Sequence, residues 1–416
     1  MSSLARHLSQ LGCTVSGSDR AENEQTEKLR NQGISVFVPH SANNVGNAKL
    51  VVRTSAVTED NPEVQYAKKH GIPVILREEL LGEVFDSYSE RIAVCGTHGK
   101  TTVTAMLHHV LERCGISHVA FIGGEYDGNN YFCGQHTVIA EACEYNRSFL
   151  RLHPTLCVCL NVEYDHPDCY KGTEDVERAF EKLFTQSERV VLHSAHRNLW
   201  RDAEFFGERG VTAENIRLEN GYARFHLHVD GEYVCNVSLG VCGEHNVKNA
   251  LAVVAAAKTL HLPLLQVAQA LATFHGVDRR WTEQKGALRV VCDYAHHPTE
   301  IATSVKTAQS VSNGRVICVF QPHTYSRTQA FFDEFISCFD GADQIIYLPV
   351  YSAREKPLPH VTSYRLYLRA RAAGKNTKYF PDFQRCATFL KRTAKDDDVI
   401  VLVGAGDVNK LAELLR

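Results

Sequence analysis

The feature that most constrains the fold of this chain is a repeated alternation of short apolar runs with amphipathic segments. It is clearest in the last third, where stretches with helical spacing separate Val- and Ile-rich runs. These runs are "RVVCD" (289–293), "RVICVF" (315–320), "QIIYLPV" (344–350), "KYF" (378–380) and "VIVLVGAG" (399–406). Strands of a parallel sheet are covered by helices on both faces and therefore read as short apolar runs. The pattern predicts an α/β fold with mostly parallel, Rossmann-like sheets.

Two earlier blocks repeat this pattern, so the sequence predicts three domains. The first block contains the runs "CTVSGSD" (13–19), "VFV" (36–38) and "LVVRTSAV" (50–57). We place the domains at residues 1–90, 91–275 and 276–416. A chain of 416 residues is too long for one compact domain but suits two or three, each with its own core.

Composition and charge narrow the class of partners. The formal net charge is −3, which offers no basic footprint for nucleic acid. The chain is 44% hydrophobic but has no uninterrupted apolar run of about 18 residues, so we expect no membrane span. Its 14 cysteines are scattered without Cys-x-x-Cys pairs, which is typical of reduced thiols in the cytoplasm. Small molecules are the expected partners, and the sequence leaves the oligomeric state open.

The stretch "RIAVCGTHGKTTVTAMLHHV" (91–110) predicts a phosphate-binding loop between a buried strand and an amphipathic helix. The loop consists of Gly96, Thr97, His98, Gly99, Lys100, Thr101 and Thr102. A helix N-terminus presents backbone N–H groups and the positive end of its dipole to a phosphate, and Lys100 adds a mobile charge. The Thr101 hydroxyl can hold Mg²⁺. The alternative is an ordinary strand-to-helix turn, because this chain has Val94 where the usual loop has a glycine.

Polar residues follow the next two apolar runs at the points where strands are expected to end. They are Glu141 and Glu144 after the first run, and Asn161, Glu163, Asp165, His166 and Asp168 after the second. The carboxyl ends of neighbouring parallel strands meet in one crevice, so Glu144 and His166 could join Thr101 around a metal ion. A carboxylate, a hydroxyl and an imidazole beside a triphosphate suit Mg²⁺ or Mn²⁺ better than zinc. Taken singly, each of these residues could equally be a solvated loop side chain.

Six stretches together resemble the Mur ligase family, and the resemblance spans nearly all of the chain. They are "GTHGKTT" (96–102), "EACEYNRSF" (141–149), "NVEYDHPDCY" (161–170), "GEHNVKNALA" (243–252), "DYAHHPTEI" (293–301) and "FQPHTYSRT" (320–328). The last two are similar to the alanine-adding branch of the family. The resemblance implies a UDP-sugar-binding domain, a central ATPase domain and a C-terminal domain that closes over the site.

The resemblance also implies a reaction with ATP, assisted by Mg²⁺ or Mn²⁺, and with UDP-N-acetylmuramate and L-alanine as substrates. ATP would phosphorylate the lactoyl carboxylate of UDP-N-acetylmuramate, and the amine of L-alanine would then displace the phosphate. A carboxylate is a poor electrophile, which explains why its oxygen is first made part of a leaving group. Such a chain would act in peptidoglycan precursor synthesis.

The roles of individual residues are likewise implied by the resemblance. The implied phosphate and metal contacts are Lys100, Thr101, Glu144 and His166, with Arg280 reaching the phosphates and Asp293 binding ribose or metal. The implied adenine contacts are His245, Asn246 and Asn249. The implied amino-acid site comprises Tyr294, His296, His297, His323 and Arg327, whose guanidinium suits a carboxylate. The implied UDP-substrate contacts are Ser18, Asp19, His40 and Ser55. Of all these, the expected catalytic groups are Lys100, His166, His296 and Arg327.

Simpler interpretations remain for several of these positions. Asn246 could cap a strongly apolar helix, Arg280 could be solvated, and the pair His296 and His297 could be structural.

The start of the chain departs from the family pattern. Residues 2–11 predict a helix, and a strand follows that ends near Asp19. Relatives begin this nucleotide-binding unit with a further strand and a glycine-rich loop, which would lie before Met1. We expect Met1 to be an internal methionine, and the N-terminal sheet to lack an inner strand.

Three functions other than this ligase are each compatible with part of the sequence. A murein-tripeptide recycling ligase would be distinguished by its use of tripeptide in place of L-alanine. A non-catalytic nucleotide-binding fragment is favoured by the absent loop but opposed by the intact Lys100, Glu144, His166 and Asp293. A phosphotransferase is disfavoured because nothing in the sequence indicates a hydroxyl acceptor site.

Overall fold

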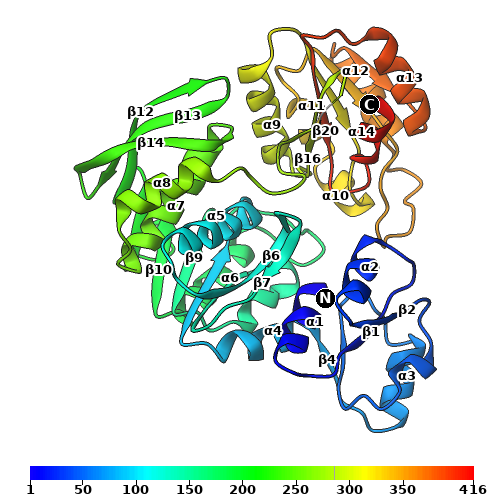
Figure 1. The fold of residues 1–416 in the computed structure, drawn as a ribbon. Coiled ribbons are helices and arrows are strands. Elements are labelled where there is room, and N and C mark those ends of the chain that lie inside the picture. The colour runs from blue at the N-terminus through cyan, green and yellow to red at the C-terminus, as the bar shows by residue number, and fades with distance from the viewer. Residues whose placement is uncertain (285) are drawn as a thin grey trace.

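The structure, a computed structural model, describes residues 1–284 and 286–416 and contains three α/β domains. Figure 1 shows the N-terminal domain in blue, the central domain from cyan to green and the C-terminal domain from yellow to red. The central domain contacts the N-terminal domain through Glu125 and Lys28, and the C-terminal domain through Asp165 and Arg327. The predicted fold class, three α/β domains with a central domain that carries the phosphate loop, is confirmed.

The N-terminal domain contains two separate pairs of parallel strands. β1 (Ser16–Ser18) pairs with β2 (Ser35–Phe37), and β3 (Val51–Arg53) pairs with β4 (Val74–Leu76). Its helices are α1 (Ser2–Gln10), α2 (Glu24–Asn31), α3 (Pro62–Lys69) and α4 (Arg77–Asp86), with a 3₁₀ turn η1 at Ala42–Val45. No hydrogen-bonded ladder joins the two pairs in the described part of the chain.

The central domain is built on a ten-stranded sheet in the order β14-β13-β12-β11-β10-β9-β5-β8-β6-β7. Its strands are β5 (Glu90–Cys95), β6 (His118–Tyr126), β7 (Asn129–Phe132), β8 (Thr137–Glu141), β9 (Leu156–Cys159), β10 (Arg189–His193), β11 (Glu204–Gly207), β12 (Val211–Glu219), β13 (Tyr222–Val229) and β14 (Glu232–Cys242). Its helical segments are α5 (Lys100–Arg113), η2 (Tyr145–Arg151), α6 (Thr173–Thr185), η3 (Ser194–His196), α7 (His245–Thr259) and α8 (Leu264–Thr273). Neighbours in the sheet run parallel from β12 through β11, β10, β9, β5 and β8 to β6. At the two ends, β7 is antiparallel to β6, and β12, β13 and β14 are antiparallel to one another in turn.

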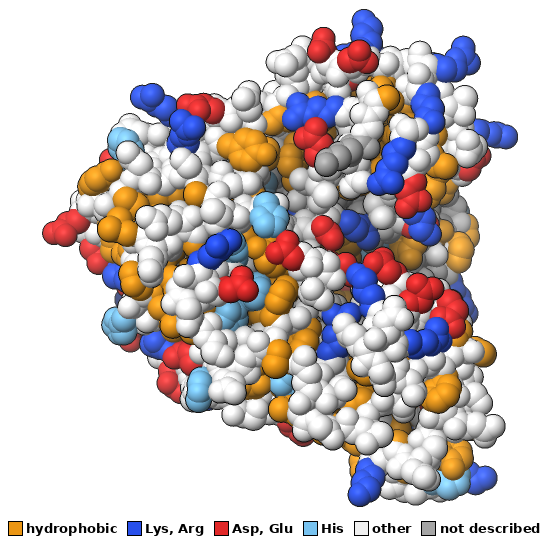
Figure 2. All heavy atoms as spheres, in the orientation of Figure 1, with side chains coloured by type: hydrophobic (Ala, Val, Ile, Leu, Met, Phe, Trp, Pro, Cys, Tyr) orange, Lys and Arg blue, Asp and Glu red, His pale blue; other side chains and the backbone are white. Residues whose placement is uncertain are grey.

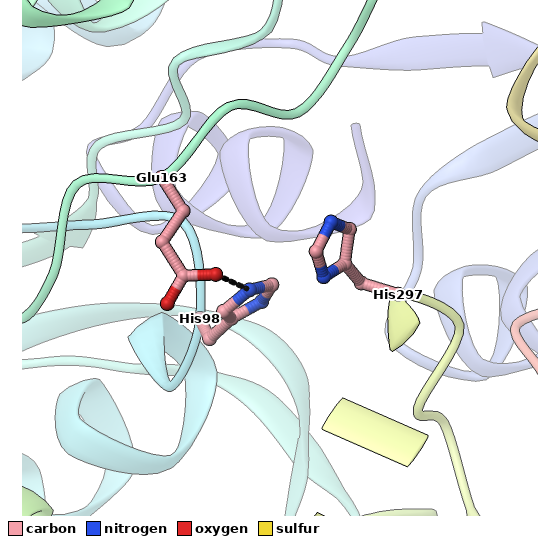
Figure 3. A group of neighbouring side chains, drawn as sticks. All are labelled: His98, Glu163 and His297. Carbon is pink, nitrogen blue, oxygen red and sulfur yellow. Dashed lines mark ion pairs between the residues drawn. The ribbon is translucent and has the colours of Figure 1, made fainter. Parts of the chain in front are cut away.

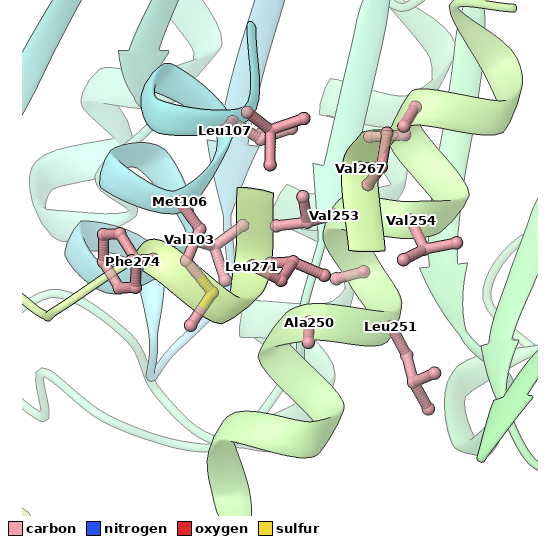
Figure 4. Close-up of a cluster of buried hydrophobic side chains, with 14 of the residues drawn as sticks. Val103, Met106, Leu107, Ala250, Leu251, Val253, Val254, Val267, Leu271 and Phe274 are labelled. Atoms are coloured by element: carbon pink, nitrogen blue, oxygen red, sulfur yellow. The ribbon is translucent and has the colours of Figure 1, made fainter. Parts of the chain in front are cut away.

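Alternate residues of the central strands enter two different cores, which explains their continuous apolar sequence. In β5, Ile92 and Val94 pack in a core with α5, α7 and α8, whereas Ala93 and Cys95 pack on the opposite face with α1, α4 and α6. Figure 4 shows the first core, in which side chains from the three helices interdigitate. Both faces are therefore dry, as a parallel sheet requires.

The C-terminal domain has a six-stranded sheet in the order β15-β16-β20-β17-β18-β19. Its strands are β15 (Thr282–Gln284), β16 (Arg289–Asp293), β17 (Val316–Phe320), β18 (Gln344–Tyr347), β19 (Thr377–Tyr379) and β20 (Val399–Val403). Its helices are α9 (Pro298–Val311), α10 (Tyr325–Ala330), α11 (Glu334–Ser337), α12 (Ser363–Ala372), α13 (Phe383–Thr393) and α14 (Lys410–Leu415). All five apolar runs of this third of the sequence form strands, and only β15 is antiparallel to its neighbour.

Acidic and basic side chains are interspersed over the face shown in Figure 2. Among the described residues, no helix combines the length and the apolar character that a membrane crossing demands. All 14 cysteines are free thiols.

Candidate active site

The predicted phosphate loop joins β5 to α5 and is held in shape by the strand beside it. His98 N–H donates to Asn161 Oδ1 at 2.8 Å, and Asn161 Nδ2 donates back to His98 O at 3.0 Å. Gly99 is left-handed, with φ +86°, and a Cβ there would lie 2.9 Å from Asn249 Oδ1. The loop therefore needs glycine at this position for its backbone conformation and for the close approach of α7.

Lys100 lies at the first turn of α5, and its side chain is 14% exposed. Its Nζ donates to Gly96 O at 2.6 Å, to Thr97 O at 3.1 Å and to both Glu144 oxygens at 2.9 and 3.1 Å. Burial disfavours the charged ammonium, but the Glu144 carboxylate beside it outweighs this effect and raises the pKa of Lys100. The lysine is therefore charged at neutral pH and can neutralise a phosphate.

Glu144 and His166 meet beside this lysine, as the sequence predicts. The sheet order β9-β5-β8 places the carboxyl ends of these three strands together. Glu144 is only 3% exposed, and His166 Nε2 lies 3.5 Å from its Oε1. Burial favours the neutral acid, but Lys100 and His166 overcome it and hold the pKa of Glu144 below its usual value. Thr101, which is also buried, follows Lys100 on α5, and a carboxylate, an imidazole and a hydroxyl are donors of the kind that fits Mg²⁺ or Mn²⁺.

A buried ion pair connects the central and C-terminal domains next to this group. Arg327 NH2 donates to both oxygens of Asp165, at 3.1 and 3.2 Å, although the two residues are 162 positions apart. Asp165 is 5% exposed and Arg327 is 7% exposed. Burial opposes ionisation of Asp165, but Arg327 more than offsets it and lowers the pKa of Asp165. The Nε of Arg327 is buried and has no hydrogen-bond partner among the described residues, so the guanidinium keeps donor capacity.

Glu300 is a site residue that the sequence-based assignment missed, and Glu163 was named there only among the polar residues that follow a strand. His98 lies between them, with Nδ1 3.3 Å from Glu300 Oε1 and Nε2 3.4 Å from Glu163 Oε2. Burial alone would lower the pKa of His98, but the two carboxylates raise it to about 9. Glu300 also accepts from the backbone N–H groups of His296 at 3.0 Å and His297 at 3.3 Å. The sequence does contain a signal for Glu300: it stands three residues after the N-cap His297, which is the spacing of a capping box and indicates that its side chain faces the start of α9.

A cavity of about 720 Å³ opens between the central and C-terminal domains. Predicted nucleotide contacts line it, namely His98, Gly99, Thr102, His245, Asn246, Asn249, Arg280 and Asp293. Asn246 is not the N-cap of α7, which is Glu244; instead its Nδ2 donates to Cys242 O at 2.6 Å. Burial lowers the pKa of His245 to about 4, so this side chain is neutral. Arg280 packs on Tyr294, 4.9 Å from the ring centre, and its NH1 lies 3.8 Å from Glu300 Oε1; its side chain is 26% exposed, so it is partly solvated.

The predicted amino-acid site gathers aromatic and imidazole rings at the start of α9 and after β17. The ring centres of His296 and His323 are 6.1 Å apart, and His323 stacks on Tyr351 at 5.6 Å. His296 Nδ1 lies 3.0 Å from Tyr294 O, which fixes the ring. Burial lowers the pKa of His296 to about 3 and keeps it neutral.

The predicted UDP-substrate residues are only partly brought together. Ser18 Oγ lies 2.8 Å from His40 Nδ1 and donates to Glu63 Oε2 at 2.6 Å. Asp19 follows Ser18 at the end of β1, whereas Ser55 is exposed in the turn after β3 and contacts neither Ser18 nor His40 by a hydrogen bond in the described structure.

Comparisons with known proteins cover the same three regions. Residues 1–89 match the model described as "Mur ligase family, catalytic domain", residues 94–257 match "Mur ligase middle domain", and residues 279–406 match "Mur ligase, glutamate ligase domain". The UDP-N-acetylmuramate–L-alanine ligase of Acetivibrio thermocellus is 40% identical over 435 residues, which cover 100% of this chain and 92% of that protein.

Solved structures resemble this one over its full length. The UDP-N-acetylmuramate-alanine ligase MurC from Thermotoga maritima superposes with a TM-score of 0.87 at 30% identity and covers 100% of this chain and 95% of its own. A murein peptide ligase from Psychrobacter arcticus has a TM-score of 0.73 at 22% identity, with the same coverage of both chains. The second likeness shows a shared fold only.

Proposed function

Because the chain belongs to the Mur ligase family, we propose that it is the ATP-dependent ligase that joins L-alanine to UDP-N-acetylmuramate in peptidoglycan precursor synthesis. One observation carries the proposal: a full-length relative with this activity is 40% identical. The convergence of Lys100, Glu144 and His166 beside a large interdomain cavity supports it.

The proposed reaction has two chemical steps. A lactoyl carboxylate oxygen attacks the γ-phosphorus of ATP, which releases ADP and leaves an acyl phosphate. The amine of L-alanine then attacks the acyl carbon, the amide bond forms, and inorganic phosphate leaves. Bound Mg²⁺ or Mn²⁺ would offset charge on the phosphoryl group, and Thr101, Glu144 and His166 are the residues that we assign to hold it.

The charged and neutral groups of the site suit these steps. Lys100 stays ionised and lies at the helix N-terminus, where it would hold the transferred phosphoryl group. Arg327 has a free Nε–H for the carboxylate of L-alanine. With its Nδ1 proton donated to Tyr294 O, neutral His296 keeps Nε2 as an acceptor for the amine. We assign the adenine to the cavity lined by His245, Asn246 and Asn249.

The free thiols favour a cytoplasmic location, where these substrates would be found. We assign the UDP-substrate site to Ser18, Asp19, His40 and Ser55 in the N-terminal domain.

A coupled assay of ADP and phosphate release tests the proposal. The protein is incubated with UDP-N-acetylmuramate, ATP and Mg²⁺, and L-alanine is compared with glycine, L-serine and the murein tripeptide. We expect L-alanine to be preferred. Removing the Lys100 charge in Lys100→Ala should lower kcat/KM by about 100- to 1,000-fold, as for other groups that stabilise transition-state charge. Tripeptide-dependent release would instead assign the recycling ligase, and equal release by Lys100→Ala and the parent would refute the assigned phosphate site.

A further inference from the structure

His98, Glu163 and His297 form a group of metal-ligating side chains outside the predicted Mg²⁺ site (Figure 3). His98 lies on the loop between β5 and α5, Glu163 follows β9, and His297 is the N-cap of α9. The group thus contains two residues of the central domain and one of the C-terminal domain. We propose that these three side chains bind a first-row transition metal ion, such as Zn²⁺ or Co²⁺, that ties the two domains together.

The distances are compatible with a shared ion. One potential ligand atom from each residue lies within 4.8 Å of those of the other two. His98 Nε2 and Glu163 Oε2 are 3.4 Å apart, about the separation of two ligands at the roughly 2.1 Å bond lengths of tetrahedral zinc. Two imidazoles and one carboxylate are a donor set that selects zinc and its neighbours over Mg²⁺, which prefers oxygen ligands.

The polar atoms of this group are poorly satisfied without an ion. His297 Nε2 is buried and lacks a hydrogen-bond partner among the described residues, and the buried Nε2 of His98 has the 3.4 Å ion pair with Glu163 but no hydrogen bond of good geometry there. His297 is only 6% exposed, and its ring centre lies 4.8 Å from that of His98. Within the described part of the chain, the His297 ring makes one hydrogen bond, in which Nδ1 accepts from Thr299 N–H at the long distance of 3.3 Å. Buried polar atoms normally have a hydrogen-bond partner or a ligand, so a metal ion would satisfy these nitrogens.

The surrounding residues would orient and neutralise the ion. Glu300 Oε1 lies 3.3 Å from His98 Nδ1, which is the carboxylate–histidine arrangement that fixes a metal-binding imidazole. Thr299 Oγ1 donates to Glu163 Oε2 at 3.2 Å and restrains this carboxylate. Glu163 and Glu300 together balance the charge of a divalent cation. If His297 gave up the Thr299 bond, α9 would keep its cap, because Glu300 accepts from two N-terminal backbone N–H groups.

Cobalt is the probe of choice, because its visible absorption reports the ligand set. The full-length protein is stripped with a chelator, supplied with excess Mg²⁺ and titrated with Co²⁺, and bound metal is measured by mass spectrometry. We expect one Co²⁺ per chain that excess Mg²⁺ does not displace, and bleaching of its spectrum by Zn²⁺. No retained Co²⁺ would overturn the proposal and leave His98 as a protonated bridge between two carboxylates.

Three variants locate the ion. His297→Asn keeps a side-chain acceptor at the helix N-cap but removes the imidazole, so it should lose the Co²⁺ spectrum and still unfold cooperatively. The exposed His261 gives the matched control, His261→Asn, which should bind Co²⁺ like the parent. Glu300→Gln should weaken Co²⁺ binding about 10- to 100-fold, as is usual when the hydrogen-bond partner of a metal-binding histidine is changed. Retention of the spectrum by His297→Asn, with its loss in Glu144→Gln, would place the ion at the phosphate site and overturn the proposal.

Discussion

Replacing Arg327 with lysine separates the two roles that we assign to its guanidinium. One NH2 group pairs with Asp165 at 3.1 and 3.2 Å, and the buried Nε–H is free to bind the carboxylate of L-alanine. Lysine keeps a positive charge for Asp165 but cannot donate from two sides of a planar fork. A neutral residue would be a poorer choice, because a buried carboxylate left unpaired costs about 3–5 kcal/mol and could unfold the interface.

The expected loss of activity follows from one hydrogen bond that lysine cannot replace, the bond from Arg327 Nε–H to the L-alanine carboxylate. A hydrogen bond to a charged group contributes about 1.5–3 kcal/mol, which corresponds to roughly a 10- to 150-fold fall in kcat/KM for L-alanine. Initial rates of phosphate release are measured against L-alanine concentration, with ATP and UDP-N-acetylmuramate saturating. When the ATP concentration is varied instead, the KM for ATP of Arg327→Lys should be nearly that of the parent, because no ATP contact is assigned to Arg327.

Arg147→Lys is the matched control for this experiment. Arg147 pairs with Asp175 through a side chain that is 41% exposed, so the same substitution there should leave the alanine dependence as it is. An Arg327→Lys enzyme with the parent's kcat/KM for L-alanine would refute the assignment of Arg327 as the carboxylate partner.

Two further predictions concern the loop and the core. Gly99→Ala should weaken the binding of a fluorescent ATP analogue, because the added Cβ would collide with Asn249. Gly115→Ala is the control: it has the same left-handed backbone strain, about 1–2 kcal/mol, but the added Cβ would have no atom within 4 Å. This control should therefore lower the melting temperature without affecting binding of the analogue. Leu271→Ala should lower the free energy of unfolding in urea by about 2–5 kcal/mol, because Leu271 is buried between α5 and α7. Leu265 lies on the same helix but is 60% exposed, so Leu265→Ala should have nearly the parent's free energy of unfolding.

The strands that position the site could be predicted, because the burial of both their faces determines which residues their local sequence contains. A strand covered on both faces must be apolar throughout, and Ile92 to Cys95 satisfy this requirement over two cores. The meeting of Glu144 with His166 then follows from the order of parallel strands alone. The antiparallel extension formed by β12 to β14 was not predicted, because its partly exposed strands mix apolar and polar residues and lack the continuous apolar run of the parallel ones.

The pairing of the charged residues could not be predicted in the same way. Asp165 and Arg327 meet across a domain interface over 162 positions, and no local pattern specifies which carboxylate a guanidinium will reach. Glu300 was overlooked for a different reason: its capping spacing explains a helix start without reference to His98, which it contacts from another domain.

These pairings bear on how substrates enter the proposed site. Each cation that we assign to an anionic substrate group already has a protein carboxylate: Lys100 has Glu144, and Arg327 has Asp165. A triphosphate that approached Lys100 would therefore also meet Glu144, and two anions in a buried site repel each other strongly. A divalent cation held by Glu144 would remove this conflict, because it would give the carboxylate a new partner and leave the Lys100 ammonium to the phosphate. The metal ion that we propose therefore also accounts for how a lysine paired with Glu144 could bind a phosphate.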